Sequence, residues 1–335
     1  MSDVASIRGQ RVVVGGGCGL MGSYLVPALV TAGARVRVID NLANGTHDAL
    51  AAVAGEIEFI EADLRDRAIC DQFLGGHQLF INLAATASGV GFSRTHHGEM
   101  LVDNLLCGLV PLQAAQRAAV PHMVMVSSSC VYSDDAPVPT PELDPFIGSP
   151  ERVNEGYGWA KRVQELGAGY FVREYGMRIT IIRPFNLYGA RYPWNSAEKA
   201  HVIPSLVKRV LDGEDPLVVW GSGEQRRNFL HGTDVAELIL RIIASSPAEP
   251  VNLGYEEDTR IADLVALVCD VTGRHPQIVF DASRPDGLAR KSADSTRLRA
   301  LTGNYEPRVS LRRGIEEMVE WYERTFGRST VPQVR

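Results

Sequence analysis

The amino-acid sequence predicts an α/β fold in which a doubly wound parallel sheet is joined to a second, smaller α/β region. Short, continuous apolar runs alternate with helical stretches along the first half of the chain. Such runs are typical of strands that are buried on both faces of a parallel sheet, and their alternation with helices indicates right-handed βαβ units. After residue 188 this regularity is lost, which indicates a second region built from discontinuous pieces.

The individual elements follow from these runs. Strands are expected at residues 11–16, 34–40, 56–63, 77–85, 122–129 and 178–186. Helices are expected at residues 20–31, 99–119, 154–175 and 231–245. Residues 190–201 and 279–291 show no period. We therefore expect a first domain of residues 1–188 plus 231–258, and a second domain of residues 189–230 plus 259–335.

Composition narrows the class of protein. The 335 residues are 45% hydrophobic and 22% charged, as in a globular protein. No apolar run approaches the ~20 residues that span a bilayer, and the N-terminus lacks the apolar core of a signal peptide; both predict a cytoplasmic protein. Five scattered cysteines without a CxxC pair predict reduced thiols and no metal site. A net charge of −6 argues against nucleic-acid binding but allows a small anionic substrate.

A glycine-rich turn follows the first strand. Gly16, Gly19 and Gly22 have the GxxGxxG spacing, which permits a tight turn and lets backbone N–H groups approach a pyrophosphate. An ordinary turn can also be rich in glycine, but the position directly between a strand and a helix favours a dinucleotide site. Leu20 and Met21, at the start of that helix, complete the expected loop.

Asp40 ends the second expected strand. A carboxylate there can accept hydrogen bonds from the adenine ribose and repels a 2′-phosphate, so NAD is favoured over NADP as the cofactor. The alternative is an aspartate that only caps a turn. Further residues expected beside the cofactor follow later strands: Asn41, Asp63, Leu64, Ala84 and Ala85.

Tyr157 and Lys161 are spaced so that they share one face of a helix, and Ser128 ends an earlier strand. A phenol has a pKa of ~10 and becomes a useful base when a nearby ammonium favours the phenolate. These three residues therefore predict hydride transfer between a hydroxyl-bearing carbon and the nicotinamide, with Tyr157 as the base. A surface Tyr/Lys pair is the alternative, which the glycine loop and Asp40 disfavour.

With these residues in order, the chain resembles the extended short-chain dehydrogenases/reductases of the NAD-dependent epimerase/dehydratase family over nearly its whole length. Within that family it is similar to the GDP-fucose synthases, which are epimerase-reductases, and to the GDP-mannose 3,5-epimerases. The segments that carry this resemblance are 81–92, 127–132, 183–189, 201–209, 218–231 and 279–291. The last three resemble the synthases most, whereas Gly89 to Phe92 resembles the mannose epimerases more.

The resemblance implies an acid/base role for Cys130, which corresponds to a cysteine of both groups of enzymes. Protons beside a sugar ketone are acidic because the carbanion is an enolate, so a thiolate can remove one while an acid on the other face returns one. His201 matches the partner acid of the synthases, and Lys199 matches that of the mannose epimerases. The sequence leaves both open.

Substrate-binding residues are expected in four groups. Arg183 and Asn186 end a strand, where ligands bind in such sheets. The resemblance implies that Arg227 binds the diphosphate, with Arg226 as a less favoured neighbour. It also implies that Asp281, Arg284 and Lys291 hold the guanine-nucleotide end, and that Ser88, Gly89 and Asn104 line or support the sugar pocket.

The sequence therefore predicts a redox-neutral, NAD-dependent isomerase that epimerises a GDP-linked hexose through a transient keto-sugar. Asp40 disfavours the NADPH-linked epimerase-reductase activity of the synthases, which remains an alternative. A pyranose/furanose mutase needs the same redox site, and a non-catalytic NAD-binding regulator is disfavoured by the intact Ser128, Tyr157 and Lys161. The resemblance also implies a homodimer formed through helices 99–119 and 154–175.

Overall fold

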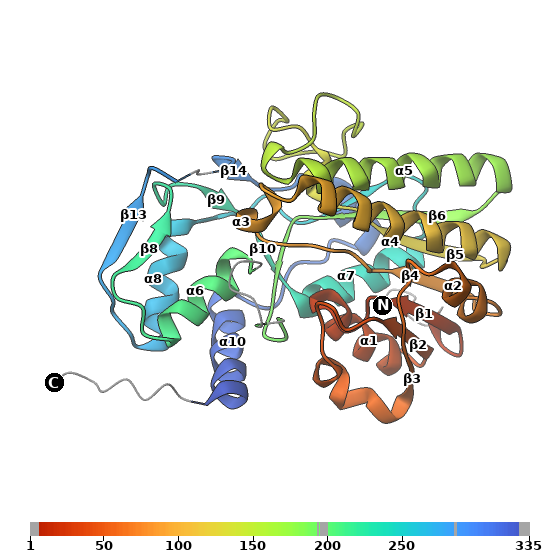
Figure 1. Cartoon of the computed structure of the whole chain (residues 1–335), viewed down its shortest axis with the longest axis horizontal. Coiled ribbons are helices and arrows are strands. Elements are labelled where there is room, and N and C mark those ends of the chain that lie inside the picture. Colours follow the sequence, from red (N-terminus) through yellow and green to blue (C-terminus); the bar gives the residue numbers. More distant parts are fainter. Residues whose placement is uncertain (1–6, 193, 195–199, 285–286, 328–335) are drawn as a thin grey trace.

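The protein is described by a computed structural model that covers residues 7–192, 194, 200–284 and 287–327. Its centre is a seven-stranded sheet in the order β11-β6-β5-β4-β1-β2-β3 (Figure 1), and all its pairings are parallel. The strands are β11 (Val251–Leu253), β6 (Arg178–Pro184), β5 (His122–Val126), β4 (Leu79–Asn82), β1 (Arg11–Gly15), β2 (Arg35–Asp40) and β3 (Ile57–Glu61). The expected doubly wound sheet is confirmed, and its order reverses between β1 and β4, where ligands bind in such folds.

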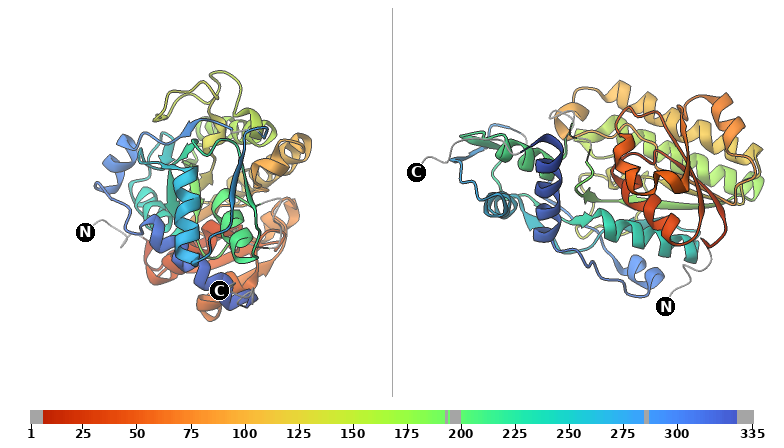
Figure 2. Two further views of the ribbon diagram at one scale, coloured as in Figure 1. Left: turned by 90° about the vertical axis from the view of Figure 1, so that its left-hand side faces the viewer. Right: turned by 90° about the horizontal axis from the view of Figure 1, so that it is seen from below.

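Helices cover both faces of the sheet (Figure 2). The helix α1 packs against α7, which also contacts α9, whereas α4 packs against α2 and α5. Their bounds are α1 (Leu20–Thr31), α2 (Arg67–Phe73), α4 (His97–Arg117), α5 (Glu155–Tyr175), α7 (Gly232–Ser245) and α9 (Thr296–Thr302). Three 3₁₀ helices and a short α-helix lie between them. The 3₁₀ helices are η2 (His47–Glu56), η3 (Ser129–Val131) and η4 (Arg152–Asn154), and the α-helix is α3 (Val90–Ser93). The helices expected at 20–31, 99–119, 154–175 and 231–245 are thus present.

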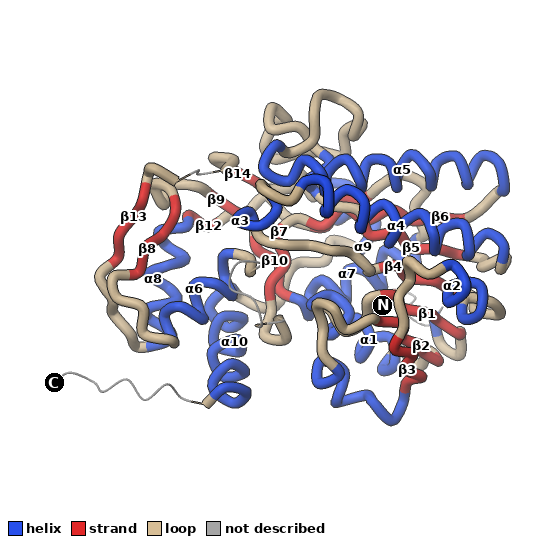
Figure 3. The backbone as a smooth tube through the Cα atoms, in the orientation of Figure 1, coloured by secondary structure: helices blue, strands red, loops and turns tan. Residues whose placement is uncertain are grey.

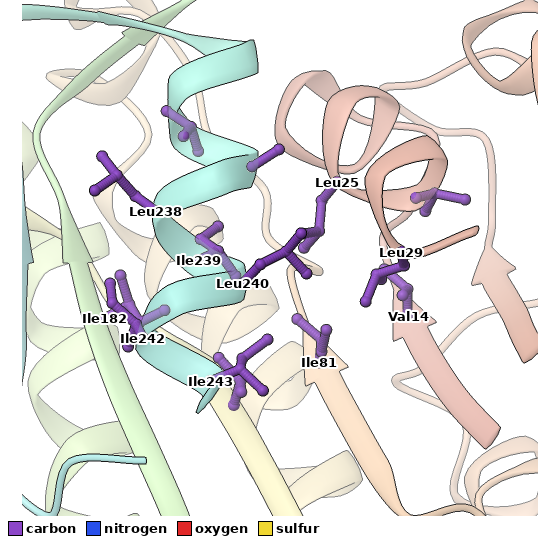
Figure 4. Close-up of a cluster of buried hydrophobic side chains, with 14 of the residues drawn as sticks. Val14, Leu25, Leu29, Ile81, Ile182, Leu238, Ile239, Leu240, Ile242 and Ile243 are labelled. Atoms are coloured by element: carbon purple, nitrogen blue, oxygen red, sulfur yellow. The ribbon is translucent and has the colours of Figure 1, made fainter. Parts of the chain in front are cut away.

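Separate apolar cores hold the two helical layers on the sheet. On one face, Leu25 and Leu29 of α1 lie with Val14, Ile81 and residues of α7 (Figure 4). On the other face a second core joins the sheet to α4 and α5. Burying one such side chain stabilises the fold by about 1.5–3 kcal/mol relative to leaving it exposed. The carboxyl edge of the sheet, where the candidate site lies, is therefore rigidly supported.

The remaining elements form a smaller region, on the left of Figure 1. It contains α6 (Val202–Leu211), α8 (Ile261–Thr272) and α10 (Leu311–Phe326). Its short strands are β8 (Leu217–Trp220), β9 (Arg226–Arg227), β12 (Thr259–Arg260), β13 (Ile278–Asp281) and β14 (Arg290–Lys291). A core of its own, with Ile203, Leu264 and Ile315 fully buried, holds these helices together.

The two regions are linked by further contacts that the sequence analysis did not anticipate (Figure 3). The strand β7 (Asn186–Tyr188) pairs in parallel with β10 (Phe229–His231). Leu298 of α9 is buried in the same core as the α7 side chains, although α9 falls in the segment expected to form the second domain. Within the described residues, no helix combines the length and apolar character needed to cross a membrane.

Candidate active site

The glycine-rich turn lies between β1 and α1, and at Gly16 it has no room for a side chain. Gly16 has a φ of +73°, and a Cβ at this position would lie 2.8 Å from backbone atoms of Ala84. Ala84 and Ala85 follow β4, so the turn touches the neighbouring strand's end at the switch point. Glycine is favoured here because a side chain would meet both a left-handed backbone and a steric clash.

The start of α1 fits the pyrophosphate of a dinucleotide. A Cβ on Gly22 would lie 2.3 Å from a carbonyl oxygen of the turn. Gly19 is the N-cap of α1 and makes no side-chain capping hydrogen bond. The first-turn amides, including those of Leu20 and Met21, are thus left for an anionic group, which the helix dipole also favours.

Asp40 ends β2 beside this turn and is 8% exposed. Its Oδ2 accepts a hydrogen bond from the Cys18 N–H (2.9 Å), and its Oδ1 accepts one from the Leu42 N–H (2.8 Å). Asp40 therefore does anchor the turn, as the alternative interpretation had it. Each carboxylate oxygen still has a second lone pair that can accept from a ribose hydroxyl.

Asn41 and Asp63 lie next to each other beyond β2 and β3. The Asn41 amide donates to Asp63 Oδ2 (3.0 Å), and the Arg65 guanidinium donates to the same oxygen (2.7 Å). The hydrogen bond from Arg65 is the main reason that the pKa of Asp63 falls to about 2. Leu64 is 4% exposed and packs under Gly15, so its side chain belongs to the core.

The structure brings Ser128, Tyr157 and Lys161 together at the carboxyl end of β5. Ser128 is the N-cap of η3, where its Oγ accepts from the Cys130 N–H (3.1 Å), and it is also hydrogen-bonded to Tyr157. The Lys161 ammonium donates to the carbonyl oxygen of Val126 (2.8 Å) and lies 5.6 Å from the centroid of the Tyr157 ring. The helix α5 thus aims the phenol and the ammonium at one strand end.

The pKa shifts within this group differ from the expectation. Burial, followed by the Cys130 thiol, raises the pKa of Tyr157, while the hydrogen bond with Ser128 lowers it. Burial lowers the pKa of Lys161 to about 8 against the opposing effect of Cys107 and Glu165. The expected lowering of the phenol pKa by Lys161 is therefore not found in the resting protein. The ammonium sits beside the ring and is committed to a carbonyl.

Cys130 lies on η3 in a buried, charged environment. Its Sγ is 3.7 Å from the Lys291 ammonium, which is 2.9 Å from Glu151 Oε2. Burial and then the Glu151 carboxylate raise the pKa of Cys130 to about 12, whereas Lys291 lowers it. Lys291 was expected at the guanine-nucleotide end; the structure places it beside the thiol, because β14 pairs with β9.

His201 is the N-cap of α6 and is solvent-exposed. Its backbone N–H donates to the Tyr192 hydroxyl (3.1 Å), and the two rings meet edge to face. Surrounding protein atoms and then the positive charge of Lys291 lower the pKa of His201. Lys291 thus interacts electrostatically with both His201 and Cys130. Lys199, the other expected partner acid, lies outside the described residues.

Arg183 was expected to bind substrate, but its contacts are structural. Its Nε and Nη2 donate to the two carboxylate oxygens of Glu165 (2.9 and 2.6 Å). Its Nη1 donates to the Tyr132 hydroxyl (2.9 Å) and to the carbonyl oxygen of Leu143 (2.8 Å). Arg183 is 1% exposed, and its guanidinium holds α5 against β6 through Glu165. The sequence could not show this pairing.

Replacing Arg183 with methionine is expected to lower the free energy of unfolding by about 3–5 kcal/mol, because the Glu165 carboxylate is left buried without its partner. Denaturant unfolding measures this loss. The double variant Arg183→Met/Glu165→Met removes both charges and should recover much of the lost stability. A variant with unchanged stability but impaired nucleotide-sugar binding would restore Arg183 to the substrate site.

Two arginines on β9 point to different partners. Arg226 forms an ion pair with the buried Asp258 carboxylate (2.5 Å). Arg227 is half-buried and lies near enough to Lys291 that its charge lowers the lysine pKa. Since Arg226 is committed to Asp258, Arg227 is the better placed of the two for an anionic substrate group.

Asp281 ends β13, and Arg284 follows it in the smaller region. Arg284 is 3.6 Å from Asp281 Oδ2, and its guanidinium carbon lies 5.4 Å from the centroid of the Trp220 ring. Arg94 lies 5.9 Å from the same centroid. Trp220 is 43% exposed, so an aromatic face flanked by cations is open to solvent next to two expected substrate residues.

The residues expected at the sugar pocket lie on the connection that follows β4, on α4 and on β7. Asn104 exchanges hydrogen bonds with both main-chain groups of Thr86 (3.0 Å each), which fixes this connection. The Ser88 hydroxyl is buried and has no hydrogen-bond partner among the described residues. Gly89 is buried at the turn that leads into α3. Asn186 on β7 donates to the carbonyl group that follows β9 (2.9 Å).

Sequence reasoning missed two residues of this site. Glu151 carries no motif signal, because its role depends on contacts with residues far away in sequence. Trp220 lies in the segment 218–231, which carries the family resemblance. Its place in that segment was a signal that sequence reasoning could have used. Cation–π contacts with Arg94 and Arg284 become visible only in three dimensions.

Comparisons with known proteins identify the family of the chain. The family model "NAD dependent epimerase/dehydratase family" matches residues 12–254. The chain is 36% identical over 273 residues to a putative GDP-L-fucose synthase 2 of Oryza sativa, covering 79% of this chain and 78% of that protein. It is 30% identical over 330 residues to GDP-L-fucose synthase 1 of Arabidopsis thaliana, covering 96% of each.

Among solved structures, a UDP-glucose 4-epimerase of Thermotoga maritima bound to UDP-glucose superposes with a TM-score of 0.84. The identity is 29%, and 94% of this chain and 99% of that chain are covered. The matched family segment contains the glycine turn, Asp40 and the Ser128–Tyr157–Lys161 group. The chain therefore belongs to the NAD-dependent epimerase/dehydratase family of enzymes, whose cofactor is NAD.

Proposed function

We propose that the protein is a redox-neutral isomerase of a GDP-linked hexose, which it epimerises through a transient keto-sugar. The observation that carries this proposal is the contact network joining Tyr157, Ser128 and Cys130 at one strand end. A phenol and a serine serve the oxidation of a hydroxyl, and a thiol beside them serves proton removal next to the resulting ketone. A simple dehydrogenase needs no thiol at this position.

The residues divide the reaction between them. When bound, NAD supplies a hydride acceptor that can return the hydride to the sugar. Tyr157 takes the proton of the reacting hydroxyl, which Ser128 orients, and gives it back when the ketone is reduced. Cys130 and His201, or Lys199 in its place, remove and return the proton at the neighbouring carbon. Burial favours the neutral form of Cys130, and the surrounding protein atoms together with the charge of Lys291 favour the neutral form of His201, so one can donate a proton and the other accept it.

A nucleotide-linked substrate is supported by the chemistry of the smaller region. Arg227 can pair with a diphosphate, and Trp220 with Arg284 and Asp281 offers an aromatic face and polar groups for a purine base. The relatives named as GDP-L-fucose synthases favour guanine as that base. We propose accordingly that residues 189–230 plus 259–335 bind the nucleotide sugar, and that residues 1–188 plus 231–258 bind NAD.

An NADPH-dependent epimerase-reductase acting on GDP-4-keto-6-deoxymannose is the second candidate. The names of the relatives favour it, whereas the carboxylate of Asp40 disfavours a 2′-phosphate beside β2. A ring mutase would use the same redox residues as the epimerase.

Product analysis separates these activities. We expect the purified enzyme to convert GDP-mannose, GDP-L-galactose or GDP-galactose with no net oxidation or reduction of added cofactor. NMR of the product distinguishes inversion at a ring carbon from a change of ring size. If only GDP-4-keto-6-deoxymannose reacts, with one NADPH consumed for each molecule converted, the redox-neutral proposal is wrong.

A homodimer through α4 and α5 is also proposed. These helices pack against each other and carry several exposed apolar side chains. These are Val102, Leu106, Leu166, Tyr170 and Val172. Apolar patches of this kind on paired helices are typical of subunit interfaces. Light scattering of the purified protein tests this proposal, because a monomeric mass would exclude it.

A further inference from the structure

Three segments that are far apart in sequence converge on the Cys130 thiol. Cys130 belongs to η3, Glu151 precedes η4, and Lys291 ends β14. The Lys291 ammonium is 3.7 Å from Sγ and 2.9 Å from Glu151 Oε2. The Asn154 side chain donates to the same Glu151 oxygen (2.9 Å). The thiol thus has a fixed cation and a fixed anion as direct neighbours.

This ion pair is buried to an unusual degree for a lysine. The side chains of Lys291 and Glu151 are 11% and 8% exposed. Removing two charges from water is costly, and such a pair seldom stabilises a fold better than apolar residues of similar size would. A role in stability alone therefore explains the pair poorly, whereas its contact with the proposed acid/base residue gives it a chemical role.

The two charges act on the thiol in opposite directions. An ammonium within about 4–6 Å favours a thiolate, and a carboxylate at the same range disfavours it. Lys291 lowers the pKa of Cys130, and Glu151 raises it. The interaction with the thiol in turn helps to lower the pKa of Glu151. With the carboxylate fixing Lys291 in place, the cluster stays neutral overall while the thiol is protonated.

We propose that Lys291, held by Glu151, is a positioning residue that makes the thiolate form of Cys130 accessible during proton transfer. The proposal rests on the proposed function, in which Cys130 exchanges a proton with a carbon beside a ketone. As Sγ takes that proton, the electron pair of the C–H bond stays on the substrate as an enolate. The negative charge thereby moves from sulfur to the substrate. The Lys291 ammonium stabilises the state before this transfer, in which Cys130 is a thiolate.

Other titratable groups near the cluster are few enough to be considered one by one. Tyr157 of α5 faces the thiol and interacts with it electrostatically. The charge of Lys291 lowers the pKa of His201, the N-cap of α6, and the charge of Arg227 on β9 acts on Lys291; neither His201 nor Arg227 is among the groups that shift the pKa of the thiol. Substituting Lys291 or Glu151 therefore changes the charge beside the thiol but leaves the proposed acid/base residues Tyr157 and His201 in place.

The test is the pH dependence of Cys130 alkylation in the purified protein, because only the thiolate reacts. Iodoacetamide labelling is followed by mass spectrometry of the peptide that contains Cys130. Lys291→Met is expected to raise the pKa of Cys130 by about one to three units, and so to slow labelling at a fixed neutral pH about tenfold or more. Lys291→Arg keeps the charge and should label at a rate close to that of the unaltered protein.

Glu151→Gln should shift the profile in the opposite direction and speed labelling, because it removes the charge that disfavours the thiolate. If the pair were only structural, Lys291→Met and Glu151→Gln would change the labelling rate of Cys130 in the same direction. Lys208→Met is the matched control, since it removes a lysine paired with Asp212 on α6 (2.6 Å) and should leave the profile unchanged.

Two results would overturn the proposal: an unshifted profile in Lys291→Met, or equal slowing by Lys291→Met and Lys291→Arg. If the Glu151 variant does not fold, the two lysine variants decide the question. If the thiol resists iodoacetamide, ultraviolet titration of the thiolate, taken as the difference from Cys130→Ala, gives the same pKa. Labelling requires no substrate, so it is independent of the proposed function, which fails separately if the unaltered enzyme moves no solvent deuterium into a GDP-sugar.

Discussion

Replacing Tyr157 with phenylalanine is expected to lower the turnover of the GDP-sugar by about 10²–10⁴-fold, the usual contribution of a general acid/base. The phenol is the group hydrogen-bonded to Ser128 at the end of β5, and phenylalanine keeps the ring but removes its oxygen. Turnover measured by NMR, together with the NAD content of the purified variant, checks this result. Bound NAD should be retained, because the glycine turn and Asp40 are untouched.

Tyr175→Phe is the matched control for this change. Tyr175 ends the same helix, α5, and is 53% exposed, so loss of its hydroxyl should leave turnover and NAD content unchanged. Equal rates for Tyr157→Phe and the unaltered enzyme would remove Tyr157 from the mechanism. Loss of NAD along with activity would mean that the phenol serves binding more than proton transfer.

Replacing Cys130 with alanine is expected to stop the exchange of protons beside the ketone by a similar factor of about 10²–10⁴, while transient oxidation of the sugar continues. The side chain removed is the proposed acid/base group, whereas Tyr157, Ser128 and Lys161 remain in place. In deuterated water, the unaltered enzyme should introduce deuterium at the inverted carbon, and the variant should not. Formation of bound NADH, followed by absorbance, should persist in the variant.

The rate of deuterium uptake by the unaltered enzyme should also depend on pH in a defined direction. Burial raises the pKa of Cys130 to about 12, so the thiolate fraction, and with it the exchange rate, should rise with pH throughout the neutral range. Cys269→Ser is the control, because Cys269 is a buried cysteine of α8 remote from η3. Undiminished deuterium uptake in Cys130→Ala would show that another residue is the base.

The fold was predictable because its signals are local. Continuous apolar runs such as Val12–Val14 and Val124–Val126 could be recognised as strands buried on both faces, and both are buried in β1 and β5. The spacing of Tyr157 and Lys161 places them on one helix face whatever surrounds them. The smaller region was less predictable, because strands such as β9 and β14 contain only two residues each, which is too short for a period to appear.

The contacts that the sequence did not reveal at the candidate site have a different origin. Arg183 was assigned to the substrate because it ends a strand, but its charge is satisfied by Glu165, a residue of another element. Lys291 was assigned by its neighbours in sequence, yet it contacts Cys130. In both cases a long side chain reaches a partner that only the tertiary structure reveals. The local sequence thus pointed to these residues but did not reveal the side chains that they contact.

The pairing of β14 with β9 also limits how the chain can vary in length. Arg290 lies opposite Arg226, and Lys291 lies opposite Arg227, while Arg290 is bonded to Asp258. Neighbouring residues of a strand face opposite sides, so a slip by one residue toward the carboxyl end would move Arg290 into the place of Lys291. A guanidinium would then replace the ammonium beside the sulfur atom. The number of residues between Asp281 and Arg290 is therefore a chemical constraint, and natural insertions or deletions should be tolerated elsewhere on the surface sooner than in this connection.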